Sequence, residues 1–326
     1  MHYFQLAADQ NIPEAQTFLG LIYFEGIYLT KDIDKAIKYL LLASKNNYAI
    51  AQFQLGCIYN EGKYVPKDLN KAFSYFKMAS DQNYILAQYN LGILHLQDGN
   101  IDKAIDYLTL SSNKNHSDSA FNLGLIFIDE KYGKENITRG LYYLKHAADD
   151  LNCWKSQYNL GIIYYEGKYI QKDIDKSIHY FQLAAKQNHH QSLCSLGTIF
   201  SDGKYKPIDI TKAISYFQQD VNLYKSSDSC LALGLIYYNF KQDIKTALYY
   251  LHLSAEQNND QAMFNIGQIY TELDDFEKAL YYFKLAADHN NAKARHFLGI
   301  VYSHKDSGMV NMQKAFYYYY DSRITI

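Results

Sequence analysis

The hydrophobic positions of the chain follow a helical period, and the whole pattern recurs nine times along 326 residues. In each copy a glycine follows Leu or Ile and is itself followed, two residues later, by Ile, Leu or Val. These glycines lie 32 to 37 residues apart: Gly20, Gly56, Gly92, Gly124, Gly161, Gly197, Gly234, Gly267 and Gly299. A period of this length predicts a solenoid of stacked supersecondary units.

Each unit contains two helical patterns, called helix A and helix B. Helix A carries a small residue five positions before the glycine and an aromatic residue or His three positions after it. Helix B begins with Asp or Asn, whose side chain accepts a hydrogen bond from the first helical turn. The predicted caps are Asp32, Asp68, Asn100, Asn136, Asp173, Asp209, Asp243, Asp275 and Asn311. A tyrosine stands seven residues after every cap, so the nine hairpins share one predicted buried face.

The recurring glycine needs a compensating role, because glycine inside a helix costs roughly 1 kcal/mol relative to alanine. The interval from the small residue of helix B to the next glycine is 20 or 21, whereas the interval from helix A to helix B varies between 12 and 16. The constant interval between helix B and the next glycine indicates that consecutive repeats pack tightly there, and the variable interval between helix A and helix B indicates a surface turn. We therefore expect the glycine to let helix B of the same hairpin approach closely at its small residue.

These residues carry a family resemblance. The stretch AQFQLGCIYNEGKYVPKDLNKAFSYFKMAS, residues 51–80, closely resembles the Sel-1-like repeat, a relative of the tetratricopeptide repeat. The resemblance implies an all-α fold, a right-handed α/α superhelical solenoid of helix-turn-helix repeats that covers residues 1–326. In this interpretation residues 1–10 form a half repeat, and about nine units occupy residues 11–326.

The chain departs from the family pattern in three places. Tyrosine replaces the second glycine of the A–B turn at Tyr28, Tyr64, Tyr169 and Tyr205. The usual Ala-Ala pair of helix B is replaced by Asp220 and Val221, which puts local packing in doubt. The chain also begins inside a helix B, so the edge with Tyr3, Phe4 and Leu6 is a candidate for self-association.

The resemblance implies a non-enzymatic interaction scaffold or adaptor that holds a peptide or helix of a partner protein in a concave groove. An alternative is a regulatory Sel-1-like tail of a larger protein kinase, or part of a membrane-associated ubiquitin-ligase assembly. In that alternative the chain is a fragment of a longer protein. The sequence identifies neither the partner nor the pathway.

Charge and hydropathy narrow the range of partners and locations. Lys plus Arg number 32 against 34 for Asp plus Glu, a net charge of −2, so nucleic-acid binding is not expected. No signal peptide and no apolar run of about 18 residues is present, so we expect no direct membrane insertion and a cytoplasmic location. The endoplasmic reticulum lumen is disfavoured despite sequons at Asn115 and Asn136.

No catalytic, cofactor-binding or metal-binding constellation is predicted. The eleven histidines form no His-x-x-x-His pair, and we expect none to have a cysteine partner at the spacing of a metal site. The recurring acidic residues are explained as helix caps. The four cysteines, Cys57, Cys153, Cys194 and Cys230, are read as reduced, buried thiols.

The partner-binding surface is predicted from helical geometry. The side of helix A opposite its core stripe holds the positions three before, one after and four after the glycine, and we expect this side to line the concave face. Polar neighbours stand two before the glycine. The predicted contacts are Asn60, Asn90, Asn122, Asn159, Tyr165, Tyr238 and Asn265. The competing interpretation is that the aromatic residues of helix A, such as Phe53 and Tyr158, are inter-repeat core.

Overall fold

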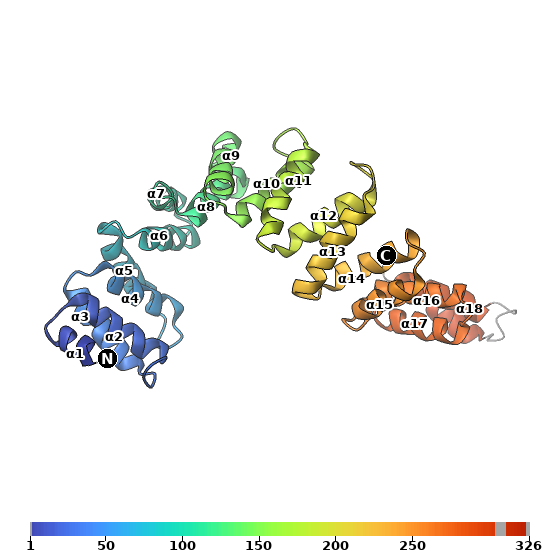
Figure 1. Cartoon of the computed structure of the whole chain (residues 1–326), viewed down its shortest axis with the longest axis horizontal. Coiled ribbons are helices and arrows are strands. Elements are labelled where there is room, and N and C mark those ends of the chain that lie inside the picture. Colours follow the sequence, from blue (N-terminus) through green and yellow to red (C-terminus); the bar gives the residue numbers. More distant parts are fainter. Residues whose placement is uncertain (1, 304–310, 324–326) are drawn as a thin grey trace. The chain divides into compact units, whose positions relative to one another are not determined.

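The computed structural model describes residues 2–303 and 311–323, and the described residues form helices and turns without any strand (Figure 1). The chain divides into two compact units, residues 1–160 and 161–326. Unit 1 contains α1 (His2–Asp9), α2 (Pro13–Glu25), α3 (Ile33–Lys45), α4 (Ala49–Glu61), α5 (Leu69–Asp81), α6 (Ile85–Gln97), α7 (Ile101–Ser112), α8 (Ser117–Ile128), the 3-10 turn η1 (Glu130–Tyr132), α9 (Ile137–Lys145) and the π-helical turn η2 (His146–Asp150). The helix α10 (Trp154–Glu166) contains the point of division. Unit 2 continues with α11 (Ile174–Lys186), α12 (His190–Asp202), α13 (Ile210–Tyr224), α14 (Ser227–Asn239), α15 (Ile244–Ala255), α16 (Asp260–Glu272), α17 (Phe276–Asp288), α18 (Ala292–Ser303) and α19 (Met312–Arg323).

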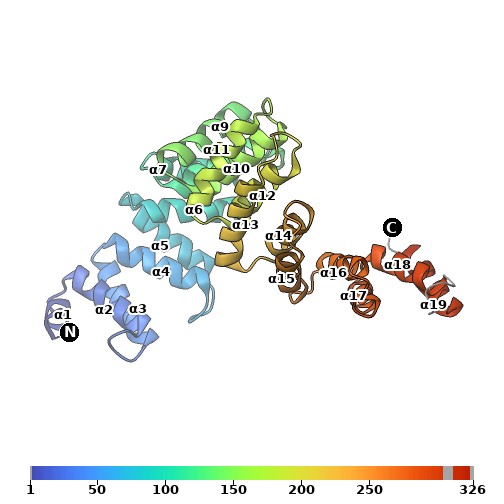
Figure 2. The same cartoon turned by 45° about the vertical axis from the view of Figure 1, so that its right-hand side comes forward.

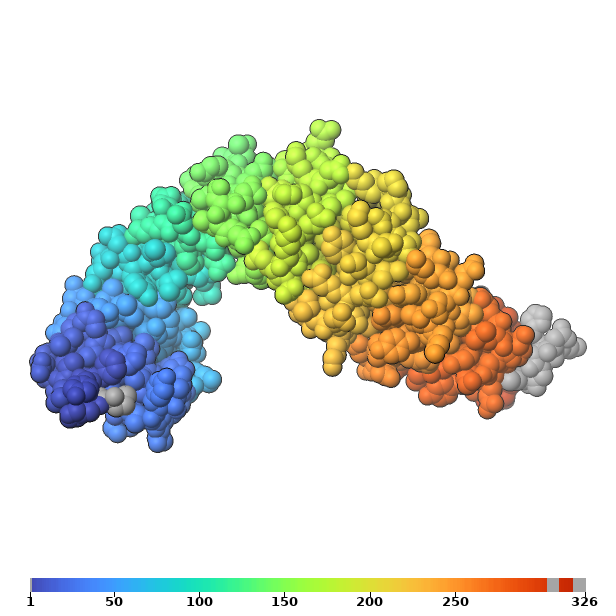
Figure 3. Space-filling model, viewed as in Figure 1, coloured from blue at the N-terminus to red at the C-terminus, as the bar shows by residue number. Residues whose placement is uncertain are grey.

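The two-helix repeat is confirmed throughout. Even-numbered helices from α2 to α18 carry the recurring glycine and are helix A, and the odd-numbered helix that follows each is helix B. Within each unit, consecutive hairpins lie beside one another in chain order (Figure 2), and side chains fill the space between neighbouring helices (Figure 3). The described residues thus form an all-α repeat solenoid.

All nine predicted caps of helix B are confirmed. Each Asp or Asn side chain accepts a hydrogen bond from the backbone N–H three residues later; the Lys35 N–H, for example, donates to the Asp32 carboxylate at 3.0 Å. The lysine at that third position also reaches back to the cap in several repeats, with Nζ 3.2 Å from the carboxylate of Asp32 and 3.2 Å from that of Asp68. The cap therefore fixes the start of helix B from local sequence alone.

The glycine of helix A lies against helix B of its own hairpin, as expected. A Cβ atom built on Gly56 would lie 2.5 Å from Cδ1 of Phe76, and one on Gly20 would lie 2.9 Å from Cγ of Leu40. The prediction that the small residue of helix B makes this contact needs a correction. The nearest contact is the buried Leu or Phe four residues later, and the small residue approaches as well: the Ala36 carbonyl lies 3.1 Å from the Gly20 position, and the Ser177 hydroxyl donates a hydrogen bond to the Gly161 carbonyl at 2.8 Å.

The recurring tyrosine of helix B packs parallel to the aromatic residue or His of helix A. Ring centroids in all nine hairpins lie 5.6 to 6.0 Å apart with planes within 14°, from Tyr23–Tyr39 to Tyr302–Tyr318. A Lys or Arg three residues after the cap often covers the helix A ring, as Lys71 covers Tyr59 at 5.0 Å. Aromatic packing and the cap thus join the two helices of a hairpin near the A–B turn.

Eight turns from helix B to the next helix A use an asparagine in the left-handed backbone region, and the α13–α14 turn uses Lys225. Positive φ values occur at Asn11, Asn47, Asn83, Asn115, Asn152, Asn188, Asn258 and Asn290. Asparagine tolerates this region better than other residues with a side chain. In the four A–B turns that carry the tyrosine, the left-handed residue is the first loop glycine, such as Gly62 with φ of 68°, which explains why tyrosine can replace the second one.

The structure bears on the sequence predictions for the N-terminal edge, the cysteines and membrane insertion. Tyr3, Phe4 and Leu6 on α1 are 83%, 42% and 44% exposed, and self-association through this edge stays a prediction. Cys153 and Cys230 are buried, whereas Cys57 and Cys194 are only half-buried, and all four are free thiols. Among the described helices, none combines the length and apolar character needed to cross a membrane.

The capping aspartates predict a loss of stability in acid. In Asp32, Asp68, Asp173 and Asp209 the capping backbone N–H, followed by the nearby lysine, holds the carboxyl pKa below its ordinary value of about 3.9. Their contribution to stability is complete above that value and is lost as the pH falls through the lower pKa of the folded chain. Changing all four to Asn, which caps α7 and α9 naturally, should make the melting temperature fall less between about pH 4 and pH 2.

Thermal unfolding followed by circular dichroism across this pH range measures the effect. The control variant is Asp34→Asn, because Asp34 lies in the first turn of α3 and the cap of that helix is Asp32. If the melting temperatures of the wild type and the four-site variant fell equally with decreasing pH, the stabilising role of the ionised capping aspartates would be contradicted.

Candidate functional site

A hollow of about 310 Å³ lies in unit 2 between neighbouring A helices, α10 and α12. It is lined by Ile162, Tyr165, Glu166, Phe181, Cys194, Ser195, Thr198 and Ile199. Tyr165 stands four after Gly161, Cys194 three before Gly197, and Thr198 one after Gly197, which are the positions predicted for the binding face. The hollow therefore lies at positions of helix A for which the sequence predicts partner contacts, and its role in binding stays a prediction.

Helix B supplies the inner side of the hollow. Phe181 of α11 is 3% exposed, and its ring lies against the glycine of α10, where a Cβ on Gly161 would approach Cδ1 of Phe181 to 2.5 Å. Ile199 of α12 is buried as well. The hollow thus has an apolar inner side with Glu166, Ser195 and Thr198 contributing polar groups, an arrangement that suits an apolar side chain on an amphipathic segment.

Tyr165 is held in place by the A–B turn of the next repeat. Its ring meets the ring of Tyr205 edge-on, with centroids 5.4 Å apart and planes at 81°. Lys172 Nζ donates a hydrogen bond to the Tyr205 hydroxyl at 3.2 Å and lies 5.7 Å from the Tyr165 ring. Hydrogen bonds from Lys204 and Lys172 hold the pKa of Tyr205 below its ordinary value. Tyr165 is therefore a preorganised part of the hollow's wall.

The same combination of an edge-on aromatic contact and a lysine hydrogen bond occurs in unit 1, and it gives the tyrosines of the A–B turns a structural role. Phe24, at the position equivalent to Tyr165, meets the Tyr64 ring edge-on with centroids 5.3 Å apart. Lys31 Nζ donates to the Tyr64 hydroxyl at 2.8 Å and lies 4.3 Å from the ring. Tyrosine at the second loop position thus ties one hairpin to the preceding one, a contact that glycine could not make.

Tyr238 makes a specific contact with its neighbouring repeat. Its hydroxyl donates a hydrogen bond to the Glu272 carboxylate of α16, and its ring packs against the apolar core of unit 2. Burial and this carboxylate raise the pKa of Tyr238 to about 12. Part of its side chain therefore serves inter-repeat packing, in line with the competing interpretation of the helix A aromatics.

The predicted asparagines lie on separate repeats and are not brought together in one site. Asn90, Asn122, Asn159 and Asn265 each donate one amide N–H to the backbone carbonyl four residues earlier, at 2.7 to 2.8 Å. This bond fixes the side-chain orientation along helix A. Asn60 is half-buried on α4. Their binding role stays a prediction.

The sequence analysis overlooked a group of chemically active side chains. His190 and Cys194 stand four residues apart on α12, and the buried carboxylate of Asp220 on α13 lies beside both. The statement that no histidine has a cysteine at metal spacing was therefore wrong. The missed signals were the His-x-x-x-Cys spacing and the aspartate in an alanine position. Burial raises the pKa of the Cys194 thiol to about 11, so this thiol is not a ready nucleophile at neutral pH.

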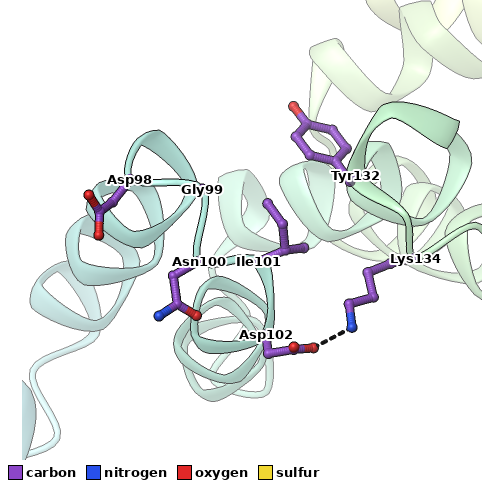
Figure 4. Close-up of a pocket in the computed structure, with 7 residues that line it drawn as sticks. All are labelled: Asp98, Gly99, Asn100, Ile101, Asp102, Tyr132 and Lys134. Carbon is purple, nitrogen blue, oxygen red and sulfur yellow. Dashed lines mark ion pairs between the residues drawn. The ribbon is translucent and has the colours of Figure 1, made fainter.

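Two further hollows lie at turns of unit 1. One of about 450 Å³ lies between the turn before α7 and the turn after η1, where Asp102 and Lys134 form an ion pair at 2.6 Å (Figure 4). Asn100 in the same hollow is the cap of α7. The other, of about 440 Å³, lies between two successive B–A turns and includes Tyr84 and His116. Asn100, Asp102 and Lys134 therefore have structural partners, which makes the α10–α12 hollow the stronger candidate site.

The fold and this surface together define a class of protein: an all-α solenoid of two-helix repeats. The Sel1 repeat family model matches residues 1–12, 13–48, 49–84, 85–116, 117–150, 154–189, 190–219, 227–259, 260–291 and 292–320. The chain belongs to the Sel1 repeat family. Arrays of these repeats are generally non-catalytic scaffolds for protein interactions.

Solved structures include proteins of the same fold. The Sel1 repeat protein from Oxalobacter formigenes is 20% identical over 92% of this chain and 90% of its own, with a TM-score of 0.67. The protective antigen c5321 of uropathogenic Escherichia coli, which displays an SLR fold, is 22% identical over 98% of this chain and 78% of its own, with a TM-score of 0.49. No curated protein matches the chain.

Proposed function

We propose that this chain is a non-catalytic scaffold that binds a peptide or helix of a partner protein along the A helices of its repeats. The observation that carries the proposal is the hollow between α10 and α12, which lies at the helix positions predicted for binding. Its apolar inner side, formed by Ile162, Phe181 and Ile199, suits an apolar anchor residue of the partner.

The chemistry of the hollow also supports a protein partner. Glu166, Ser195 and Thr198 provide one carboxylate and two hydroxyl groups beside the apolar wall, which suits hydrogen bonding to a peptide backbone. The net charge of −2 gives no overall attraction for a phosphate backbone. A binding segment with one or two apolar anchors and neighbouring polar groups fits these features.

Filling the hollow should weaken partner binding without disturbing the fold. Thr198 is an exposed residue of α12, so Thr198→Arg places a long side chain in the hollow while leaving the core intact. A protein captured by the wild type would be identified, its binding segment synthesised, and its affinity measured by calorimetry. We expect Thr198→Arg to weaken binding by about tenfold or more.

The matched control is Ser215→Arg, which adds the same side chain at an exposed position of α13 outside the hollow. This variant should bind with wild-type affinity. Equal affinities of the Thr198→Arg variant and the wild type for the same segment would exclude the hollow as the binding site. Circular dichroism should show equal helicity for all three proteins.

A further inference from the structure

Three potential metal ligands meet where α12 packs on α13. His190 Nδ1 lies 2.6 Å from Oδ1 of Asp220, Cys194 Sγ lies 3.4 Å from Oδ2 of the same carboxylate, and Sγ and Nδ1 are 3.9 Å apart. All three donor atoms lie within 4.8 Å of one another. His190 and Cys194 are four residues apart, so both project from the same face of one helix.

Asp220 is the residue that sets this repeat apart. It stands seven residues after the small residue of helix B, at a position that is otherwise alanine or serine in the repeats up to α17. The equivalent residues are Ala43, Ala79, Ser111, Ala147, Ala184, Ser254 and Ala286. The Asp220 side chain is 0% exposed. A buried carboxylate at a position where other repeats have a small side chain lowers the stability of the fold unless hydrogen bonds or an opposite charge replace its lost hydration.

We propose that His190, Cys194 and Asp220 bind a divalent transition-metal ion, with zinc as the best match to this donor set. Imidazole nitrogen, thiolate sulfur and carboxylate oxygen are the three types of protein ligand that zinc uses. No other group of three such side chains comes together in the described part of the chain.

The distances between donor atoms suit a tetrahedral ion. With metal–ligand lengths of about 2.0 to 2.3 Å, tetrahedral geometry separates neighbouring donors by about 3.3 to 3.8 Å. The Cys194–Asp220 distance of 3.4 Å falls in this range, and the Cys194–His190 distance of 3.9 Å is slightly longer. The His190–Asp220 distance of 2.6 Å is that of a direct hydrogen bond. Small side-chain rotations would place an ion among all three.

Charge and surroundings support the same assignment. A bound zinc ion deprotonates its thiol ligand, so thiolate and carboxylate together neutralise the two positive charges. Ser229 Oγ donates a hydrogen bond to Oδ2 of Asp220 at 2.6 Å and so orients the carboxylate. The His190 side chain is 35% exposed, and Cys194 lines the α10–α12 hollow, which gives the ion a route of entry. A water molecule completes the fourth position.

The geometry argues against a cysteine nucleophile activated by histidine. In a triad the histidine uses one ring nitrogen for the nucleophile and the other for the carboxylate. Here the same nitrogen, Nδ1 of His190, is the one near both Asp220 and Cys194. This convergence on one nitrogen leaves the thiol without the relay that a catalytic triad requires, and it brings the three donor atoms close enough to share an ion.

Cobalt titration of the protein without a histidine tag tests the proposal. The chelator-treated full chain is titrated with Co²⁺ and followed by absorption, and Zn²⁺ is then added in competition. The wild type should bind one equivalent with tetrahedral cobalt bands and a thiolate-to-cobalt band, and zinc should displace the cobalt. Asp220→Ala should weaken binding by at least about 100-fold, and Cys194→Ser should abolish the thiolate band.

Two of the variants control for misfolding and for binding of cobalt to another thiol. Asp220→Ala restores the residue found at Ala184 and Ala286, so the hairpin should fold, which equal helicity will verify. Cys57→Ser removes another half-buried thiol and should leave the titration unchanged. Weak binding of equal strength in the wild type and in Asp220→Ala, without a thiolate band, would overturn the proposal. The test needs no partner protein, so it is independent of the proposed scaffold function.

Discussion

Replacing Gly56 by alanine will lower the free energy of unfolding by about 1–3 kcal/mol, although alanine favours a helix by roughly 1 kcal/mol over glycine. The added methyl group would lie 2.5 Å from Cδ1 and 2.6 Å from Cε1 of Phe76. The Phe76 ring is 0% exposed and cannot move aside without disturbing the core between α4 and α5. Overpacking therefore outweighs the gain in helix propensity.

Urea unfolding followed by circular dichroism measures this loss. Phe76→Ala alone should cost about 3–5 kcal/mol, and the double variant should lose less than the sum, because removal of the ring makes room for the methyl group. Ser74→Ala, at an exposed position of α5, is the control and should change stability by less than about 0.5 kcal/mol. A Gly56→Ala variant more stable than the wild type would refute the close-approach role of the glycine.

Replacing Gln52 by methionine should cost about 2 kcal/mol or more, because this buried amide joins two repeats. Gln52 is 0% exposed, and its Nε2 donates to the Ser44 carbonyl at 3.4 Å and to Oδ1 of Asn47 at 3.1 Å. Its Oε1 accepts a hydrogen bond from Gln82 at 2.6 Å. Methionine has a similar shape but no such groups, so the partners would lose their hydrogen bonds inside the joint.

Gln88 provides a matched control in the next repeat. It occupies the position equivalent to Gln52 and is 2% exposed, but its Oε1 atom has no hydrogen-bond partner among the described residues. Gln88→Met should therefore be neutral or slightly stabilising, because it removes a buried acceptor without a partner. Equal losses for the two variants in urea unfolding would show that packing, not hydrogen bonding, accounts for the glutamine.

The parts of the fold that depend on local sequence were predictable. The cap of each helix B requires only an Asp or Asn and the amide three residues later, and each ring of the Tyr59–Tyr75 type of pair stands at a fixed position in its own helix, three residues after the glycine or seven after the cap. The recurring glycine indicated a close approach of helix B. The glycine contacts the Leu or Phe that stands four residues after the small residue of helix B. This contact depends on the angle at which the two helices cross, which the spacing of residues in the sequence does not determine.

The features that sequence reasoning missed depend on contacts between elements. The left-handed asparagine of the B–A turn and the buried Gln52 look like ordinary polar residues until the joint between two hairpins is assembled. Tyr165 lines the α10–α12 hollow, and its edge-on contact with Tyr205 depends on a turn 40 residues further along the chain. His190, Cys194 and Asp220 come together only because α12 packs on α13.

The asparagine–glutamine joint also has a consequence for how such an array changes length over evolution. Asn47 and Gln52 repeat the arrangement of Asn11 and Gln16, 36 residues earlier, with Nε2 of each glutamine directed at the asparagine before it. A duplication of this 36-residue segment would copy a complete joint, so the new repeat would fit both neighbours without compensating substitutions. Insertions inside the B–A turn would separate the two residues, whereas the A–B turn tolerates them. Gene duplication in whole repeats is therefore the route of growth that the joint permits.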